Sequence, residues 1–497
     1  MMHGPEKSDP AILGMKPANK PGRTGAESVD RRAGAKENAS EARAGRTLGR
    51  ETASSSLERV RERARQDQKV KFTALLHHVD VELLRKSFLA LKRKAAPGVD
   101  GVTWHDYEQD LETKLVDLHA RVHRGAYRAQ PSRRRLIPKE DGRQRPLGVT
   151  ALEDKIVQRA VVEVLNAIYE PVFLGFSYGF RRGRSQHNAL DALAFGITRT
   201  KVSFIVDADV RSFFDSLSQP WLMRFIEHRI GDPRILRLIR EWLKAGVMEN
   251  GEWQATEEGT PQGSVISPTL ANIYLHYCFD LWAHAWRRRR ARGNVVLVRY
   301  ADDSVAGFEH KDDAERFLAD LRQRLEKFGL ALHPEKTRLI EFGRFAAERR
   351  AKRGASKPET FNFLGLTHIC GQNRKGGFLL RRITRRDRFR ARLKSIKEEL
   401  RRRMHEPIPE QGRWLGQVLR GYFAYHAVPT NNACLQRFKI HVTRFWRRTL
   451  VRRGQKDVTS WARISKLAKE YLPAVVDFHP WPQDRFVVNH PRWEPGA

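Results

Sequence analysis

Short apolar runs alternate with longer amphipathic stretches over the middle of the chain, and the two patterns predict different elements. The runs "SFIVDADV" (203–210) and "VVLVRY" (295–300) are rich in β-branched residues, which is typical of buried strands. "EDKIVQRAVVEVLNAIYE" (153–170) instead repeats its apolar residues at helical spacing. The alternation of both patterns between about residues 130 and 370 predicts an α+β domain.

The strand-like run at 295–300 leads into two adjacent carboxylates, Asp302 and Asp303. "SVAGF" (304–308) predicts a returning strand, so the pair would lie at the tip of a hairpin. A second pair, at 312 and 313, precedes a helical pattern and is typical of helix capping. Adjacent carboxylates at a strand end repel each other, so a bound cation would stabilise the pair at 302 if a third acid lay nearby.

The run at 203–210 offers that acid. Side chains alternate along a strand, so Asp207 and Asp209 would share one face. One of them facing the hairpin tip would complete a two-metal site. In such a site two Mg²⁺ ions about 4 Å apart activate an attacking oxygen and stabilise the leaving one. The pattern therefore favours phosphoryl transfer.

From about residue 375 the pattern changes to long basic amphipathic stretches. "RRITRRDRFRARLKSIKEELRRR" (381–403) predicts a basic helix, and two further helical patterns follow it with aromatic residues among their arginines. Residues 1–70 contain no Phe, Tyr or Trp, which is typical of disorder. We predict four segments: a disordered basic N-terminal segment (1–70), an α+β domain (71–370), a helical domain (371–473) and an irregular C-terminal tail (474–497).

The charge of the chain identifies the kind of partner. The 497 residues include 93 basic and 58 acidic side chains, a net charge of +35. Such an excess needs a polyanion, and nucleic acid fits better than a membrane because the sequence shows no long apolar span, signal peptide or lipidation motif. The three cysteines are too few and too dispersed for a zinc module or a disulfide framework, which favours a reducing, intracellular compartment.

Seven blocks in order carry a family resemblance. They are "APGVDG" (96–101), "LIPKEDGRQRPLGV" (136–149), "FSYGFRRGRSQHNAL" (176–190), "DADVRSFFD" (207–215), "GTPQGSVISPTLANIYL" (259–275), "RYADD" (299–303) and "FNFLGLTHI" (361–369). Together they resemble the motifs of group II intron-encoded reverse transcriptases, and the resemblance covers about residues 70 to 490.

The resemblance implies a right-hand polymerase. Fingers and palm, built from an antiparallel sheet and helices, would occupy residues 71–370, and an α-helical thumb and maturase domain would follow over 371–473. Asp209 and Asp302 would be the principal ligands of two Mg²⁺ ions, and Asp303 the supporting catalytic acid. The implied enzyme is an RNA-directed DNA polymerase.

The resemblance also implies a nucleotide site, formed by Lys139, Arg145, Ser212, Phe213, Phe214 and Gln262. Lys139 and Arg145 would hold the triphosphate, as a point charge and a bidentate fork; without the motif they would read as two solvated cations. The backbone at Ser212 and Phe213 would cradle the phosphates. Phe214 would lie under the sugar and exclude a 2′-OH, so that the product is DNA, although its residue type fits a core position equally well.

Further residues are assigned to nucleic acid. Primer and template would contact Tyr300, Gly263, Arg181 and Arg184, and structured RNA would contact Arg385, Arg386, Arg390, Arg447 and Arg448. The implied partners are an RNA template with a DNA primer, dNTPs, a group II intron RNA and target DNA. Nothing in the pattern specifies an oligomeric state. We expect a bacterial cytoplasmic protein associated with the nucleoid.

Two features depart from the commonest form of the family. Arg182, Ser304 and Gln219 stand where relatives usually have Pro, a large apolar residue and His, and Ser304 removes apolar packing beside the acids. No cysteine follows Cys434, so we expect no paired-cysteine endonuclease module and DNA synthesis from a supplied 3′ end.

Two alternatives remain open. One is a splicing cofactor with a weak polymerase, which the intact acids disfavour. The other is a domesticated reverse transcriptase that serves DNA repair or phage defence without an intron.

Overall fold

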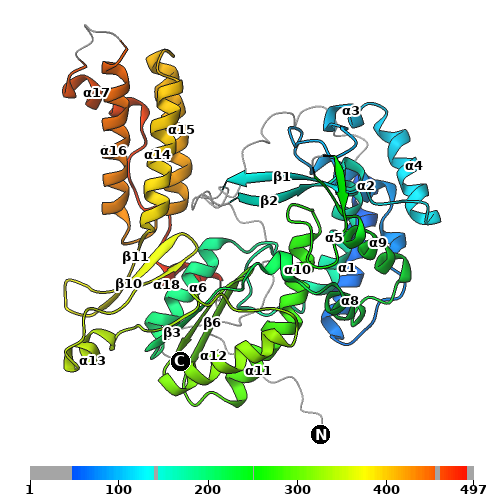
Figure 1. The fold of residues 1–497 in the computed structure, drawn as a ribbon, viewed down its shortest axis with the longest axis horizontal. Helices are drawn as coiled ribbons and strands as arrows, with labels where there is room; N and C mark the ends of the chain where they lie inside the picture. The colour runs from blue at the N-terminus through cyan, green and yellow to red at the C-terminus, as the bar shows by residue number, and fades with distance from the viewer. Residues whose placement is uncertain (1–46, 139–143, 250, 454–458, 490–497) are drawn as a thin grey trace.

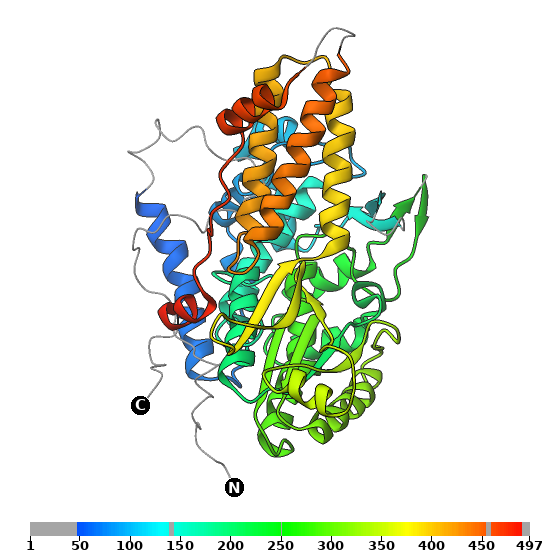
Figure 2. The same ribbon diagram turned by 90° about the vertical axis from the view of Figure 1, so that its left-hand side faces the viewer.

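The computed structural model describes residues 47–138, 144–249, 251–453 and 459–489 (Figure 1). Helices and small, largely antiparallel sheets share this part of the chain, which confirms the predicted α+β class. A bundle of helices, α14 to α17, stands at the upper left in Figure 1 and at the top of the view in Figure 2. No helix in the described part of the chain combines the length and apolar character needed to span a membrane.

A four-stranded antiparallel sheet lies at the centre of the molecule. Its strand order is β6-β7-β3-β8, with bounds β3 (Phe204–Ala208), β6 (Val295–Tyr300), β7 (Asp303–Phe308) and β8 (Arg338–Glu341). β6 and β7 form the hairpin that the sequence predicts, with Val295 opposite Phe308 and Tyr300 opposite Asp303. The strand predicted around residue 205 is β3, and it pairs directly with β7.

Helices surround this sheet because their apolar faces match its two buried surfaces. They are α6 (Gln186–Arg199), α10 (Ser267–Leu275), the π-helical turn η2 (His276–Asp280), α11 (Leu281–Arg289) and α12 (Lys311–Glu326). α6 packs on β6, where a methyl group at Gly196 would lie only 2.6 Å from Val296, so a small residue is required there. α10, η2 and α11 follow one another without a break, and Phe308 packs between Trp286 of α11 and Phe317 of α12.

A second group of elements carries a smaller sheet of order β2-β1-β4-β5. Its strands are β1 (Ser132–Pro138), β2 (Gln144–Val149), β4 (Val247–Glu249) and β5 (Glu252–Gln254). Its helices are η1 (Leu76–His78), α2 (Val81–Leu89), α3 (Trp104–Glu108), α4 (Leu111–Arg124), α5 (Leu152–Tyr169), α7 (Phe213–Ser216), α8 (Gln219–Glu227) and α9 (Pro233–Lys244). β1 and β2 project from this group toward the helical bundle (Figure 1).

A third sheet leads into the helical bundle. It has the order β11-β10-β9, with β9 (Phe361–Phe363), β10 (Leu366–Gln372) and β11 (Phe378–Thr384), and α13 (Ala346–Lys352) precedes it. The bundle comprises α14 (Arg386–Arg402), α15 (Ile408–His426), α16 (Asn432–Val451) and α17 (Trp461–Tyr471), which pack around their own apolar core. The helix predicted over 381–403 therefore begins only at Arg386, because residues before it belong to a strand.

The first part of the chain differs from the prediction of disorder. Residues 47–66 form α1 (Thr47–Gln66), which packs on α5. Ala64 is fully buried, and the Arg229 guanidinium donates to the backbone carbonyls of Ala64 and Asp67. These contacts explain why a segment without aromatic residues is ordered over this range. The remainder of that predicted segment, residues 1–46, lies outside the described residues.

The tail also differs from its predicted irregular form. It ends in α18 (Pro482–Asn489), which packs on α6. Phe486 is buried in the main core and stacks on Phe195 with ring centroids 4.2 Å apart. A single aromatic anchor thus orders a segment whose proline content hides the helix from sequence reasoning.

Candidate active site

The strand pairing brings together the acids that the sequence singles out. Asp207 lies within β3 and Asp209 directly follows it, while Ala208 pairs with Ser304 of β7. Asp303 begins β7, and the two-residue connection that precedes it contains Asp302. Ala301, the first residue of that connection, has a φ of 57°, a left-handed conformation typical of tight hairpins. The acids from both segments therefore lie at one end of the central sheet.

The acids affect one another electrostatically. Desolvation, together with the negative charges of Asp302, Asp209 and Asp207, raises the pKa of Asp303 to about 7. Burial likewise raises the pKa of Asp207 to about 6, with a contribution from Asp209. This mutual repulsion shows that the four carboxylates form one cluster, and that added positive charge would stabilise it.

Cations from two later segments face this cluster. The Lys336 ammonium lies 3.0 Å from Asp209 Oδ2. Its loop is tied to the loop of Asp209 because the His333 N–H donates to the Asp209 carbonyl over 2.8 Å. Arg338 lowers the pKa of Asp207 and Arg388 that of Asp303, each opposing the effect of burial. Sequence reasoning missed these cations, because in a chain with 93 basic residues only the fold distinguishes them.

Arg388 lies in the first turn of α14, beside the β9–β10 turn, and its charge acts on Asp303. Leu364 and Gly365 form this turn with φ of 46° and 78°. The Tyr425 hydroxyl donates to the Leu364 carbonyl over 2.7 Å, and the Arg385 N–H donates to the Gly365 carbonyl over 3.1 Å. A methyl group at Gly365 would lie 2.9 Å from Nη1 of Arg388. The turn and the helical bundle are therefore in direct contact next to the acids.

A buried ion pair supports the hairpin tip from beneath. Arg299 on β6 donates to Asp280 over 2.6 and 2.7 Å, and both side chains are almost fully buried. The same guanidinium donates to the Ala301 carbonyl over 2.9 Å and to Ser177 over 2.7 Å. Asp280 belongs to the π-helical turn, a feature often found at functional sites. This network fixes the backbone that presents Asp302 and Asp303.

The loop after β3 places the residues assigned to the nucleotide. Ser212 has a φ of 45°, Phe213 is buried and Phe214 is half-buried. The Phe214 carbonyl accepts a hydrogen bond of 2.8 Å from Thr260. Gly259, with a φ of 75°, lies so close that a methyl group there would be 2.5 Å from the Phe214 carbonyl oxygen. Phe213 is thus a core residue, whereas the Phe214 side chain is only partly buried.

The "PQG" turn lies against the same loop. Gln262 donates to Asp215 Oδ1 over 3.0 Å, and its carbonyl accepts a bond from Gly148 of β2. Gly263 has a φ of 109° and approaches the Gly148 carbonyl so closely that only glycine fits. Lys139 lies outside the described residues. Arg145 is described only in its backbone, which pairs with Ile137 in the β1–β2 hairpin.

The carboxylate oxygens of the acidic cluster are its candidate metal ligands. Carboxylate oxygens are the ligands that Mg²⁺ prefers, and the cluster already attracts the Lys336 ammonium. The donor chemistry of the acids therefore suits a divalent cation, but their spacing in this structure does not yet form a metal site. Among the described residues, no group of three His, Cys, Asp or Glu side chains stands close enough together to hold a metal ion.

Comparison with known proteins decides the family. The sequence profile of the family described as reverse transcriptase (RNA-dependent DNA polymerase) matches residues 137–368. Protein YkfC of Escherichia coli is 34% identical over 282 residues, which are 50% of this chain and 74% of that protein. The chain belongs to the reverse transcriptase family. Reverse transcriptases are RNA-directed DNA polymerases, which is the enzyme class that the sequence predicts.

Intron-encoded relatives support the finer assignment. The group II intron-encoded protein LtrA of Lactococcus lactis is 41% identical over 168 residues, which are 33% of this chain and 27% of LtrA. A putative COX1/OXI3 intron 1 protein of Saccharomyces cerevisiae is 26% identical over 308 residues, covering 52% of this chain and 36% of that protein. The predicted resemblance to group II intron-encoded reverse transcriptases and maturases is confirmed.

Within this reverse transcriptase the arginines assigned to primer and template differ in access. The Arg181 side chain is only 2% exposed, and its guanidinium is occupied by Glu170 and the carbonyls of Leu174 and Ser177. Burial lowers the pKa of Arg181 to about 10. In this structure the Arg181 side chain therefore supports its own loop, and its assignment to primer or template stays a prediction.

Arg184 and Tyr300, which are also assigned to primer and template, are more exposed than Arg181. Arg184 is half-buried, donates to the carbonyls of Gly175 and Ser177 and lies over the Tyr178 ring. Tyr300 is half-buried at the end of β6, opposite Asp303. Tyr300 is therefore in place beside the acids, while Arg184 is largely engaged by its own loop.

The arginines assigned to RNA lie on α14 and α16. Arg386, Arg390 and Arg448 are exposed. Arg385 pairs with Asp387, and Arg447 is half-buried, donates to the Thr459 carbonyl and lies 4.8 Å from the Trp461 ring centroid. The bundle thus presents some of these charges freely and uses others within the fold.

The three departures from the common family pattern have local partners. Arg182 pairs with Glu163, and the Ser304 hydroxyl lies 3.4 Å from the Ala208 carbonyl. Gln219 is buried, and its amide donates to the carbonyls of Leu243, Thr256 and Gly259. Gln219 therefore holds the loop that carries Gly259 against Phe214.

Proposed function

We propose that this chain copies RNA into DNA by two-metal phosphoryl transfer and binds a group II intron RNA to assist its splicing and mobility. The observation that carries the proposal is the convergence of Asp209, Asp302 and Asp303 at one end of the central sheet, with Asp207 beside them. When bound there, Mg²⁺ would activate the primer 3′-hydroxyl and neutralise the developing phosphate charge.

The surrounding residues would bind and orient the reactants. The ring of Phe214 would lie under the sugar, and the backbone at Ser212 and Phe213 would receive the phosphates. Lys139 and Arg145 would contact the triphosphate. Gln262 would contact the nucleotide and Gly263 the template. Tyr300 would contact the primer end. Lys336 would move off Asp209 as the metal enters, because both cations compete for the same carboxylate.

The proposed RNA partner rests on charge and on the relatives. Arg386, Arg390 and Arg448 give the helical bundle an exposed basic surface suited to structured RNA. Relatives bear names that place them in introns, and LtrA is named as group II intron-encoded. Target DNA, dNTPs and a primed RNA template complete the proposed partners, and association with the nucleoid would follow from the charge of +35.

Asp302→Ala should abolish primer extension and leave RNA affinity nearly unchanged. The substitution removes a proposed metal ligand, but only one of 58 acidic residues in a strongly basic chain. Binding should keep its steep dependence on salt, since it rests on phosphate contacts. Primer extension on RNA and filter binding over a salt series measure the two properties separately.

The second acidic pair supplies a matched control. Asp312 is exposed at the start of α12 and pairs only loosely with Arg292, at 3.7 Å. Asp312→Ala should therefore retain near wild-type synthesis. Appreciable dNTP incorporation by Asp302→Ala, or equal loss in both variants, would contradict the assignment of the active site.

A further inference from the structure

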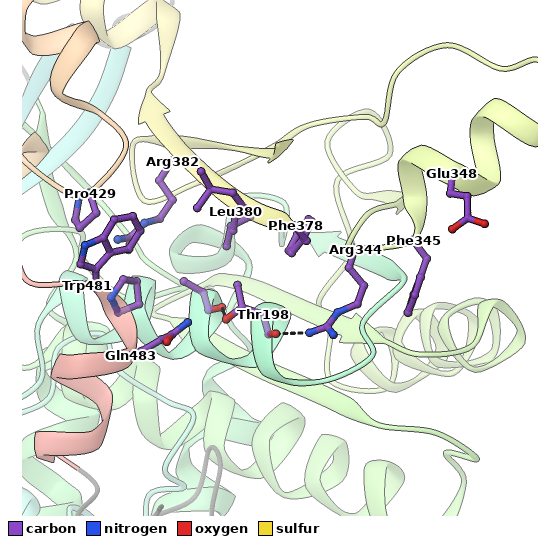
Figure 3. A pocket seen from close by; sticks show the side chains of 13 residues that line it. Thr198, Arg344, Phe345, Glu348, Phe378, Leu380, Arg382, Pro429, Trp481 and Gln483 are labelled. Carbon is purple, nitrogen blue, oxygen red and sulfur yellow. Dashed lines mark hydrogen bonds between the residues drawn. The ribbon is translucent and has the colours of Figure 1, made fainter. Parts of the chain in front are cut away.

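A groove away from the acids has no role in the proposed reaction. It holds about 480 Å³ and is lined by α6, β11, the start of α13, Pro429 and the tail around Trp481 (Figure 3). None of its lining residues comes from β3, β6 or β7, the strands that carry the carboxylates. It is therefore a site separate from the proposed polymerase centre.

Exposed aromatic rings mark the two ends of this groove. Trp481 is 51% exposed and Phe345 is 38% exposed, and Figure 3 shows them on opposite sides of Leu380 and Phe378. Pro429 lies beside Trp481 at one end. Half-exposed rings beside an apolar wall offer faces on which a planar group can stack.

The edge of β11 supplies hydrogen-bonding groups along the same groove. β11 is an edge strand, and at Arg382 both its N–H and its carbonyl bond to the Thr430 hydroxyl, over 2.8 and 3.2 Å. Backbone groups two residues apart on a strand face the same edge, so those of Leu380 and Phe378 also face it. No residue in the described ranges provides a partner to them on that edge. The groove therefore offers paired donors and acceptors beside an apolar wall.

The charge around the groove is positive. Arg199, Arg344 and Arg349 are exposed, and in the described part of the chain no carboxylate lies within ion-pair distance of them. The Arg344 guanidinium is held over the end of α6 by a hydrogen bond to the Thr198 carbonyl (Figure 3). Glu348, the acid that lines the groove, is paired with Lys352 at 2.8 Å. The rim therefore suits an anionic partner.

We propose that this groove binds an unpaired nucleotide of a single-stranded nucleic acid. The base stacks on Trp481 against the apolar wall, its edge bonds to the free backbone groups of β11, and Arg344 contacts the adjoining phosphate. Stacking rings, backbone edge groups and guanidinium are the elements by which proteins hold splayed-out bases. An extended peptide would use the β11 edge too, but it would leave the cationic rim without a partner.

Photocrosslinking tests the proposal without relying on polymerase activity. The probes are ten-residue oligouridylate carrying one 4-thiouridine and the matching oligothymidylate carrying 4-thiothymidine. After irradiation of the full-length protein, mass spectrometry maps the labelled peptides. We expect labelling of the peptides around Trp481 and Phe378, by the ribonucleotide probe alone if RNA is the source and by both probes if any single strand suffices.

Matched variants separate a specific site from general charge. Trp481→Ala should reduce labelling of these peptides at least fivefold, the lower end of what one base stack contributes, while Trp481→Phe should retain most of it. Trp253→Ala removes a similarly exposed indole on β5 and should leave groove labelling unchanged. Because Trp481 is exposed, melting temperatures should stay equal, which excludes unfolding.

Absence of groove labelling would overturn the proposal, as would equal labelling in Trp481→Ala and wild type. Amide exchange of residues 378–384 gives a second measurement, since a bound base should slow it. Protection of these amides by an extended peptide but by neither oligonucleotide would assign the groove to a protein partner instead. Failure of primer extension would leave these results intact, so the two proposals are tested independently.

Discussion

At the scale of single residues, the raised pKa of Asp303 predicts how stability depends on pH. Desolvation and neighbouring carboxylates raise it to about 7 from an ordinary value of 3.8. The folded state therefore keeps a proton that the unfolded chain has released. The stability from this group is complete below about pH 4 and is lost as the pH rises through about 7.

Asp303→Asn should thus raise the melting temperature in EDTA at pH 8 by a few degrees, with a much smaller gain at pH 5. The amide keeps the shape of the side chain and removes its charge. Addition of Mg²⁺ should narrow the difference, because the metal stabilises only the wild-type cluster. Scanning fluorimetry at both pH values measures this, and an equal gain at pH 5 and pH 8 would argue against charge repulsion as the cause.

The adjacent phenylalanines predict a difference in sugar selection. Phe214 is half-buried, whereas Phe213 is 2% exposed within the core. Phe214→Val should raise incorporation of rNTPs relative to dNTPs by about an order of magnitude, through relief of a clash with the 2′-OH. Phe213→Leu, a core substitution, should lower stability without changing this ratio. Single-nucleotide kinetics on both variants decides, and parallel behaviour would contradict the assignment.

At the scale of elements, the sequence predicts those strands and helices whose formation depends on a continuous local run of apolar residues. The β6–β7 hairpin and β3 are visible in the sequence because their apolar runs are continuous, and the acids follow them directly. α1 was missed because its inward stripe, the half-buried Leu57 and Val60 and the buried Ala64, is narrow and contains no aromatic residue. α18 was missed because its order depends on tertiary contacts with α6, among them Phe486 with Phe195 and Arg485 with Asp191.

The site shows the same division. Acids within motifs could be found from spacing, but Lys336, Arg338 and Arg388 could not, since each is one cation among 93 and acts only through the fold. Arg181 was assigned to primer and template through the family resemblance. Its neighbours in space, Glu170 and two backbone carbonyls, make it an internal support. The sequence therefore shows which residues carry a charge, but only the fold shows which group each charge contacts.

The position of α14 beside the acids predicts that the helical bundle helps to place the primer. Arg388 should contact the terminal phosphate of the primer, because its guanidinium stands beside Gly365 and its charge acts on Asp303. Arg388→Ala should raise KM for the primer–template several-fold with a smaller effect on kcat, and Arg388→Lys should recover part of the loss. Arg386→Ala, an exposed neighbour on the same helix, is the control. Equal effects of Arg386→Ala and Arg388→Ala would indicate general charge rather than placement.

At the scale of the whole molecule, the tail joins the helical bundle to the central domain. Asp191 of α6 pairs with Arg382 of β11 and with Arg485 of α18, each at 3.0 Å. The rings of His187 and His479 stack with centroids 3.8 Å apart, and their Nε2 atoms lie 2.8 Å from the carbonyls of Tyr425 and Ala424 in α15. Burial lowers the pKa of His187 to about 3 and of His479 to about 4, so both rings stay neutral.

Arg485→Ala should therefore loosen the bundle as well as destabilise the chain. Removing one partner leaves the buried Asp191 carboxylate with Arg382 alone, which costs on the order of 3 kcal/mol for a buried pair. We expect a lower melting temperature and shorter extension products, with single-nucleotide incorporation retained because the acids are untouched. Asp484→Ala, on the same helix and exposed, should change neither property. Full-length products at wild-type yield from Arg485→Ala would show that the tail does not control the bundle.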